Sequence, residues 1–187
     1  MASGIVIGFI VGIVAVVIIG YFVSIFNGLI RLSNNIKKSF ANINVLLKQR
    51  HDELPKLIST VKGYMKYEKN VLQEITKART SFMKTKDIHE KARYSNQITE
   101  ALKTIFAVAE NYPKLQANES FRHLQQRISG IENEIADRRE FYNDSVNVFN
   151  IRIHSIPDAL VAKMMGYKNQ ELFRVKPSEA ADVKVEL

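Results

Sequence analysis

The chain has 187 residues, enough for one ordinary domain and one further element, and it contains no cysteine, which excludes disulfide frameworks, cysteine-ligated zinc and thiol catalysis. Its net charge of +8 is unevenly placed: residues 1–30 carry no charged side chain, whereas residues 31–51 carry basic side chains and no acid. A nucleic-acid binder would instead show a basic stripe with interleaved aromatic residues on its folded part. The charge pattern therefore predicts a lipid bilayer as partner and no nucleic acid.

After a short N-terminus, residues 1–3, the first predicted element is the apolar stretch 4–26, GIVIGFIVGIVAVVIIGYFVSIF, in which Ser24 is the only conventionally polar residue. At a rise of 1.5 Å per residue the stretch spans roughly 30 Å, the thickness of a bilayer core. A cleaved signal peptide is the competing interpretation, but it would have a basic start, a shorter apolar core and a small-residue cleavage site. We expect a retained, single-pass transmembrane helix.

Three basic residues follow the span: Arg31, Lys37 and Lys38. The positive-inside rule then places the N-terminus outside and the rest of the chain in the cytoplasm. The same side chains are attracted to anionic headgroups and are predicted to lie at the membrane surface. A periplasmic or extracellular domain is the alternative.

Gly4, Gly8 and Gly12 stand four residues apart within the span, as two overlapping GxxxG patterns. Glycines at this spacing leave a flat face along which a second transmembrane helix can approach closely. Glycine is common in transmembrane helices generally. The overlapping pair predicts self-association of the span and a homo-oligomer.

From residue 36 to residue 82, apolar residues recur at alternating spacings of four and three, which is a heptad pattern. Pro55 falls within it, lacks an N–H group and crowds the carbonyl of His51. Asp52 could cap a new helix, so that the chain reverses and forms a four-helix bundle. Alternatively, one long helix over about 27–83 kinks near 52–55. Because the pattern keeps its phase through Pro55, we favour the kink.

The kinked alternative has a consequence for assembly. The next helix, of about 25 residues, would then cover the long helix only back to about residue 59. The apolar stripe before that point would lack a partner within the chain, and an exposed stripe of that length marks an interface. The predicted interface consists of Ile36, Phe40, Ile43, Leu47 and Leu54.

The bundle domain is predicted over 27–155, with two further helices at 88–112, capped by Asp87, and at 119–154, capped by Asn118. A short amphipathic helix at 157–166 either packs on the bundle or lies at a membrane surface, and the polar tail 174–187 is predicted to be disordered. The expected fold is all-α: an N-terminal transmembrane helix followed by an antiparallel bundle of three to four long helices with coiled-coil-like packing.

The sequence contains neither the HExxH motif of metalloproteases nor a phosphate-binding glycine loop. We therefore predict no enzymatic activity, no catalytic residue, no metal ligand and no cofactor. Polar or helix-breaking residues within the predicted helices are interpreted as buried structural positions that set register or specificity. These are Arg50, Asp52, Pro55, Glu68, Arg138 and Tyr142.

Three blocks resemble a known family: NVLLKQRHDELPKLISTVKGYMKYEKNVLQEITKAR (44–79), IFAVAENYPKLQANESFRHLQ (105–125) and ISGIENEIADRREFYNDSVNVFNIRIHSIP (128–157). Together with the apolar N-terminus followed by Phe-Asn at 26–27, they resemble the LemA family. The chain departs from the family's usual residues at Gln49, Tyr67 and Ile156. The resemblance implies a bacterial, membrane-anchored helical bundle with no assigned active site, and it adds some weight to the four-helix alternative.

The expected function is that of a single-pass, self-associating helical scaffold of the bacterial inner membrane. The alternative is a membrane adaptor or regulator that holds another membrane protein, such as a protease or a sensor.

Overall fold

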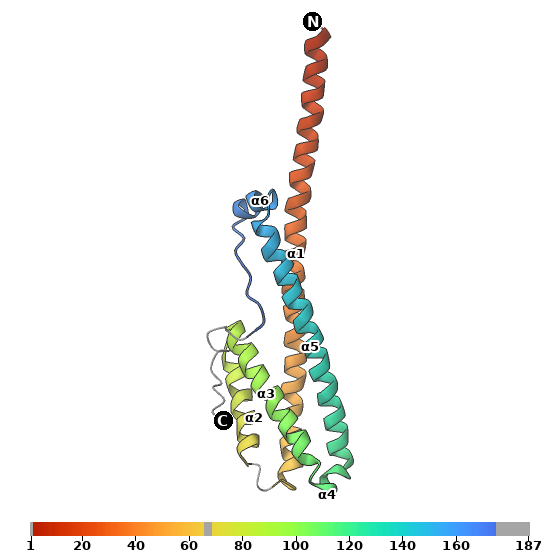
Figure 1. Ribbon diagram of the computed structural model, residues 1–187, viewed down its shortest axis with the longest axis vertical. Helices are drawn as coiled ribbons and strands as arrows, with labels where there is room; N and C mark the ends of the chain where they lie inside the picture. Colours follow the sequence, from red (N-terminus) through yellow and green to blue (C-terminus); the bar gives the residue numbers. More distant parts are fainter. Residues whose placement is uncertain (1, 66–68, 175–187) are drawn as a thin grey trace, which may run out of the picture. The chain divides into compact units, whose positions relative to one another are not determined.

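The computed structural model describes residues 2–65 and 69–174, which form helices and no strand (Figure 1). The helices are α1 (Ala2–Lys62), α2 (Lys69–Lys84), α3 (Ile88–Ala109), α4 (Pro113–Gln116), α5 (Glu119–His154) and α6 (Asp158–Met164). The chain divides into two compact units. Unit 1 comprises Met1–Lys38 and Asp144–Gln170, and unit 2 comprises Ser39–Asn143 and Glu171–Leu187. The prediction of an all-α fold is confirmed.

Unit 2 is an antiparallel bundle of four helices: α1 from Ser39 onward, α2, α3, and α5 up to Asn143 (Figure 1). Each helix turns a stripe of apolar residues to the centre, as the spacing of three and four predicts. The core includes Leu54, Leu57 and Val61 from α1, Ile75 from α2, Ile98, Leu102 and Ile105 from α3, and Phe121 and Ile128 from α5. The four-helix arrangement, which the sequence left as the alternative, is the one that forms.

Side-chain caps fix the starts of two of these helices. The carboxylate of Asp87 accepts from the backbone N–H of Glu90 at 2.8 Å, and the side-chain oxygen of Asn118 accepts from the N–H of Phe121 at 3.1 Å. Each cap satisfies a helical N–H that has no partner within its own helix. Both predicted caps are confirmed. The helix predicted over 88–112 ends earlier, since α3 ends at Ala109, and Pro113 begins the one-turn helix α4.

The chain does not reverse at 52–55, because α1 continues through Pro55, as the favoured alternative required, but α1 ends at Lys62 and not near residue 83. Asp52 therefore lies inside a helix and caps nothing. The reversal into α2 follows Gly63, a residue with low helix propensity. There the carbonyl of Val61 accepts from the N–H groups of both Tyr64 and Met65, at 2.9 Å each, which closes the last turn.

A residue of α2 compensates for Pro55. Proline has no N–H, so the carbonyl of His51, one turn earlier, loses its usual helical donor. The Nε–H of Arg79 donates to that carbonyl at 3.3 Å. The heptad pattern also resumes in phase beyond the turn, since Ile75, Ala78 and Phe82 are all buried. A proline inside α1 is thus accommodated by the helix that packs beside it.

The contact between Arg79 and His51 gives a first testable prediction. We expect Arg79→Ala to lower the free energy of unfolding by about 1 kcal/mol more in the natural chain than in a Pro55→Ala background. The alanine at position 55 supplies the missing N–H, so His51 no longer needs Arg79. Denaturant titrations of the two single variants and the double variant, in mild detergent, measure this coupling. An equal cost of Arg79→Ala in both backgrounds would contradict it.

Unit 1 combines the N-terminal part of α1, the end of α5, and α6. Its buried apolar residues are Ile25, Leu29 and Ile36 from α1, Val146, Phe149 and Ile153 from α5, and Val161 and Ala162 from α6. Gly28 is in close contact with an arginine of α5: a Cβ atom there would lie 3.0 Å from Nη2 of Arg152. The absence of a side chain at Gly28 therefore makes room for the Arg152 guanidinium against α1.

The short helix predicted at 157–166 is α6, which ends in a Schellman motif. The N–H of Tyr167 bonds to the carbonyl of Ala162 at 3.0 Å, and that of Gly166 to Lys163 at 3.2 Å. Gly166 has a φ of +68°, a conformation that favours glycine. Beyond Arg174, the predicted disordered tail lies outside the described residues.

Candidate functional site

The described residues contain one helix, α1, with a stretch long and apolar enough to cross a membrane, judged by length and composition. Its large side chains from Ile5 to Val23 are exposed, and none of the described segments of the chain packs over them. Gly4, Gly8 and Gly12 lie in this stretch, and a Cβ atom built at any of the three would meet nothing within 4 Å. The glycine face is therefore open to another molecule.

The three basic residues after the span, Arg31, Lys37 and Lys38, are all exposed. They remain on α1, within unit 1. Their positions leave them free to contact water or lipid headgroups.

The predicted interface stripe of α1 is not an exposed surface, so this prediction is wrong. Ile36 is buried in unit 1; Ile43, Leu47 and Leu54 are buried in unit 2. The ring of Phe40 is half-buried and lies 5.7 Å from that of Tyr142 and 6.4 Å from that of Phe173, centroid to centroid. Cover for α1 was expected only from the helix that follows it, whereas α5, with 36 residues, supplies additional cover.

A layer of polar side chains crosses the core of unit 2, and we call it the Arg50 layer: Arg50, Ser95, Thr99, Glu132 and Arg139. Arg50 is only 1% exposed. Its guanidinium donates to Glu132 Oε1 at 2.7 Å, to Ser95 Oγ at 2.6 Å and to Thr99 Oγ1 at 3.2 Å. The Thr99 hydroxyl donates to Glu132 Oε2 at 2.6 Å. These bonds connect α1, α3 and α5.

Arg139 of α5 also contacts Ser95 and completes the layer. Its Nη2 donates to Ser95 Oγ, and its Nη1 donates to Asn96 Oδ1 at 2.8 Å. Its guanidinium also lies over the ring of Phe173, 4.9 Å from the centroid. Burial, and then the positive charge of Arg50, lower the pKa of Arg139 to about 10. Burial also lowers the pKa of Arg50, against the opposing effect of Glu132.

A second buried carboxylate, Glu53, lies one turn from Arg50 along α1. It pairs with Arg127 Nε of α5 at 3.0 Å and with Lys56 Nζ at 3.1 Å. Because a buried charge is costly unless paired and hydrogen-bonded, these groups fit together in one arrangement of the helices. These polar contacts can therefore fix the register of the helices relative to one another. Among the described residues there is also no group of histidine and acidic side chains placed to hold a metal ion.

The structure sorts the other predicted structural residues. Tyr142 is buried as predicted, whereas Asp52, Pro55 and Arg138 are exposed, so the prediction of burial is wrong for these three. The arginine of α5 that joins the layer is the half-buried Arg139, one position further on, because the buried positions shift by one residue between Ile135 and Tyr142. Glu68 lies outside the described residues.

Sequence reasoning missed most of the Arg50 layer. Ser95 and Thr99 are four residues apart on α3, and Glu132 lies next to the buried Ile131 on α5. A buried arginine requires an acidic partner, and that requirement is the one signal that pointed to such a residue. The heptad pattern alone could not say which of several glutamates supplies it.

The Tyr142 hydroxyl donates to the backbone carbonyl of Glu171 at 2.8 Å. Burial, and then the charge of Glu171, raise its pKa from 10.0 to about 12. Below pH 10 the hydroxyl keeps its proton in both the folded and the unfolded chain. Between pH 10 and about 12 the unfolded chain loses the proton first, so Tyr142 makes stability fall as pH rises.

We therefore expect Tyr142→Phe to flatten the loss of stability between pH 10 and about 12. Arg139, with its lowered pKa, contributes a slope of opposite sign in both proteins, so the comparison of the two isolates Tyr142. Thermal unfolding at a series of pH values, followed by circular dichroism, measures it. Parallel curves for the two proteins would contradict the assignment.

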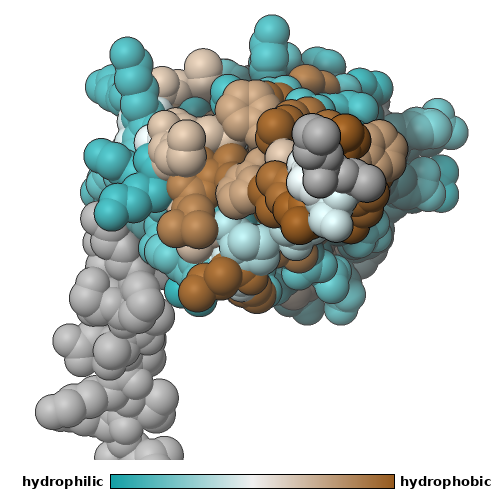
Figure 2. Space-filling model, turned by 90° about the horizontal axis from the view of Figure 1, so that it is seen from above, coloured by the Kyte–Doolittle hydropathy of each residue, from teal (hydrophilic) through white to brown (hydrophobic). Residues whose placement is uncertain are grey.

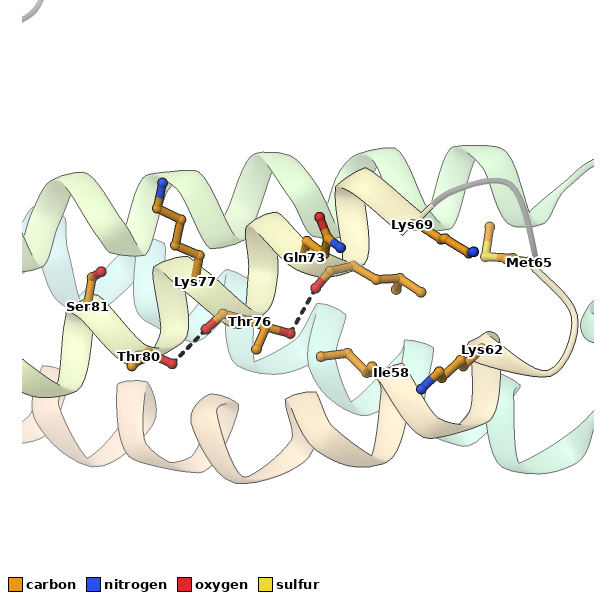
Figure 3. A pocket seen from close by; sticks show the side chains of 10 residues that line it. Ile58, Lys62, Met65, Lys69, Gln73, Thr76, Lys77, Thr80 and Ser81 are labelled. Atoms are coloured by element: carbon orange, nitrogen blue, oxygen red, sulfur yellow. Dashed lines mark hydrogen bonds between the residues drawn. The ribbon is translucent and has the colours of Figure 1, made fainter.

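A groove of about 830 Å³ runs between the end of α1 and α2 (Figure 3). Ile58, Met65 and Leu72 contribute apolar surface, and Lys62, Lys69 and Lys77 contribute three positive charges. The hydroxyls that line it, Thr76 and Thr80, donate to backbone carbonyls of α2 at 2.9 Å. The groove thus combines an apolar lining with a basic rim.

Comparison with known proteins places these features in context. The model of the LemA family matches residues 39–187. Protein LemA of Metamycoplasma hominis is 29% identical over 162 residues, covering 84% of this chain and 72% of that protein. Magnetosome protein MamQ 2 of Paramagnetospirillum magneticum is 36% identical over 78 residues, or 42% of this chain. Magnetosome protein MamQ of Magnetospirillum gryphiswaldense is 32% identical over 78 residues. The matched segment spans 29% of the length of each of these two magnetosome proteins.

Proposed function

The chain belongs to the LemA family, and from that premise we propose that it is a membrane-anchored helical scaffold that self-associates through the glycine face of α1. The observation that carries the proposal is the open stripe of Gly4, Gly8 and Gly12 in an exposed apolar helix. A flat face of this kind lets two backbones approach closely within lipid, where packing drives association. No chemical step is part of the proposal.

Because the apolar stripe of α1 is buried, the proposed interface is limited to the apolar span. Self-association through Ile36, Phe40, Ile43, Leu47 and Leu54 would require unit 1 and unit 2 to open, because these side chains fill or line their interiors. The span is thus the proposed interface, and the helices of unit 2 are the part that the anchor presents. The basic residues after the span favour a cytoplasmic location for that part, in the bacterial cell membrane.

Cysteine crosslinking in membranes tests this function. The natural chain contains no cysteine, so any crosslink must form through the introduced residue. At 100° per residue, Ala15 lies about 20° from Gly8 around the helix, and Val17 about 180° away. We expect oxidation to give a crosslinked dimer for Ala15→Cys and little or none for Val17→Cys. Equal crosslinking at both positions, or none at either, would contradict a glycine-face interface.

The groove between α1 and α2 supports a second candidate function, that of an adaptor. Its apolar lining and three lysines fit an acidic amphipathic helix of another membrane protein. Photocrosslinking from position 73 in native membranes would yield a stoichiometric partner that is lost when Lys62, Lys69 and Lys77 are changed to Glu. Crosslinks only between copies of this chain would count against the adaptor.

A further inference from the structure

The short helix α6 of unit 1 carries apolar residues on its outer side as well as its inner side. Val161 and Ala162 are buried, as expected for a helix that packs on its neighbours. Leu160 and Met164, four residues apart on the other side, are 58% and 87% exposed, and Ile156 just before the helix is 87% exposed. Single exposed apolar residues are ordinary, but three together on one short segment form a patch that water solvates poorly.

This apolar patch lies beside α1 at the point where the predicted span ends. The Arg152 guanidinium packs against Gly28, two residues beyond the span, and its Nε donates to Asp158 Oδ1, at the start of α6, at 2.7 Å. Arg152 thereby ties α6 to the level of Gly28 on α1 (Figure 1). Seen from above, apolar atoms surround the N-terminal end of α1, and further apolar atoms lie to one side of it (Figure 2).

The segment that follows α6 is held against α5, which fixes the position of the helix. The ring of Tyr167 packs edge-on against that of Phe149, with centroids 5.3 Å apart. The side chain of Asn150 makes two hydrogen bonds to the backbone of Gln170, at 2.8 and 2.9 Å. Since both ends of α6 are tied down, its outer side keeps one orientation.

The charges around the patch are positive or neutralised. Lys163 and Lys168 are exposed, and the carboxylate of Asp158 is paired with Arg152. Arg31 is exposed on α1, one turn beyond Gly28. An apolar face bordered by lysines is typical of helices that lie in the headgroup region of an anionic bilayer.

We propose that α6 is a second membrane contact: it lies in the interface of the bilayer that α1 crosses, with Ile156, Leu160 and Met164 against the acyl chains and Lys163 against anionic headgroups. The inference rests on the anchoring of α1 in the proposed function. The bilayer is the occupant because the patch continues the exposed apolar surface of α1 at the level where lipid must surround it. The anchor raises the local concentration of lipid at α6, so three side chains suffice for binding.

The test uses the full chain in vesicles of phosphatidylcholine and phosphatidylglycerol with brominated acyl chains, which quench a fluorophore on contact. Single cysteines at Leu160 and Met164 carry the label, and circular dichroism checks that each variant folds. Phe22→Cys, within the span, reports on the anchor, and Glu134→Cys, exposed on α5, is the aqueous control. We expect quenching at 160 and 164 to exceed that at 134 several-fold and to decrease with Lys163→Glu.

Two results would overturn the proposal. If 22 is quenched while 160 and 164 resemble 134, α6 is outside the lipid and the anchor stands. If the labels at 160 and 164 also show blue-shifted emission in that case, a second copy or another protein covers the patch. If 22 itself is not quenched, the anchor fails, and the inference about α6 fails with it.

Discussion

Replacing Glu132 with glutamine is expected to lower the free energy of unfolding by about 3 kcal/mol or more, because it leaves the Arg50 guanidinium buried without a counter-charge. This expectation rests on the distance of 2.7 Å between Arg50 Nη1 and Glu132 Oε1 and on the 1% exposure of Arg50. Glutamine keeps the shape of the side chain and one acceptor, so the change removes mainly the charge. Denaturant unfolding in mild detergent measures the loss.

The matched control is Glu134→Gln, the same change two residues further along α5, where the side chain is exposed. We expect it to change stability by less than about 0.5 kcal/mol. A further variant, Arg50→Met combined with Glu132→Gln, removes both charges and should recover much of the loss. Equal effects of the changes at 132 and 134 would show that the Arg50 layer does not hold the bundle together.

Replacing Leu47 with alanine is expected to lower the free energy of unfolding by about 2–5 kcal/mol, the usual range for a cavity in a core. Leu47 is 2% exposed within a single chain. If it belongs to the core of unit 2, its truncation leaves the oligomeric mass unchanged. Unfolding titrations and light scattering on the same variant measure the two quantities.

The matched control is Val45→Ala, two residues earlier on α1, where the side chain is 57% exposed. We expect a cost of less than about 0.5 kcal/mol there. A loss of oligomeric mass with Leu47→Ala, at unchanged stability, would restore the stripe of α1 to the interface that the sequence predicted.

The sequence was informative where local chemistry decides the structure. The apolar stretch 4–26, the caps Asp87 and Asn118, and the short helix before Gly166 were all predicted from residue type and spacing. Each depends on a few neighbouring residues. For the same reason the all-α fold class followed from composition and the heptad pattern.

Prediction from the sequence failed where a residue far away along the chain determines the local structure. A reversal of the chain was considered only at Pro55, but α1 continues through Pro55 and the turn follows Gly63. Arg79 of α2 donates to the carbonyl that Pro55 leaves without its helical donor. Spacing could not reveal that contact, which joins residues 28 positions apart. The layer around Arg50 is similar, since its partners come from α3 and α5, up to 82 positions away.

The role of the apolar stripe of α1 changed for a related reason. Its exposure was inferred by comparing the lengths of neighbouring helices, and that comparison left out α5, which has 36 residues. Once its side chains are seen to be buried, the case for a self-associating scaffold depends on the span alone. The glycine face is thus the central claim.

The most direct test of that claim is the molar mass of the full-length chain in mild detergent, by light scattering, beside a variant with Gly4, Gly8 and Gly12 changed to isoleucine. The matched control changes Val6, Ile10 and Val14, on the other side of α1, to leucine. We expect an oligomer for the natural chain and the control, and a monomer for the glycine variant. A monomeric natural chain, or an oligomer that survives loss of the three glycines, would contradict it.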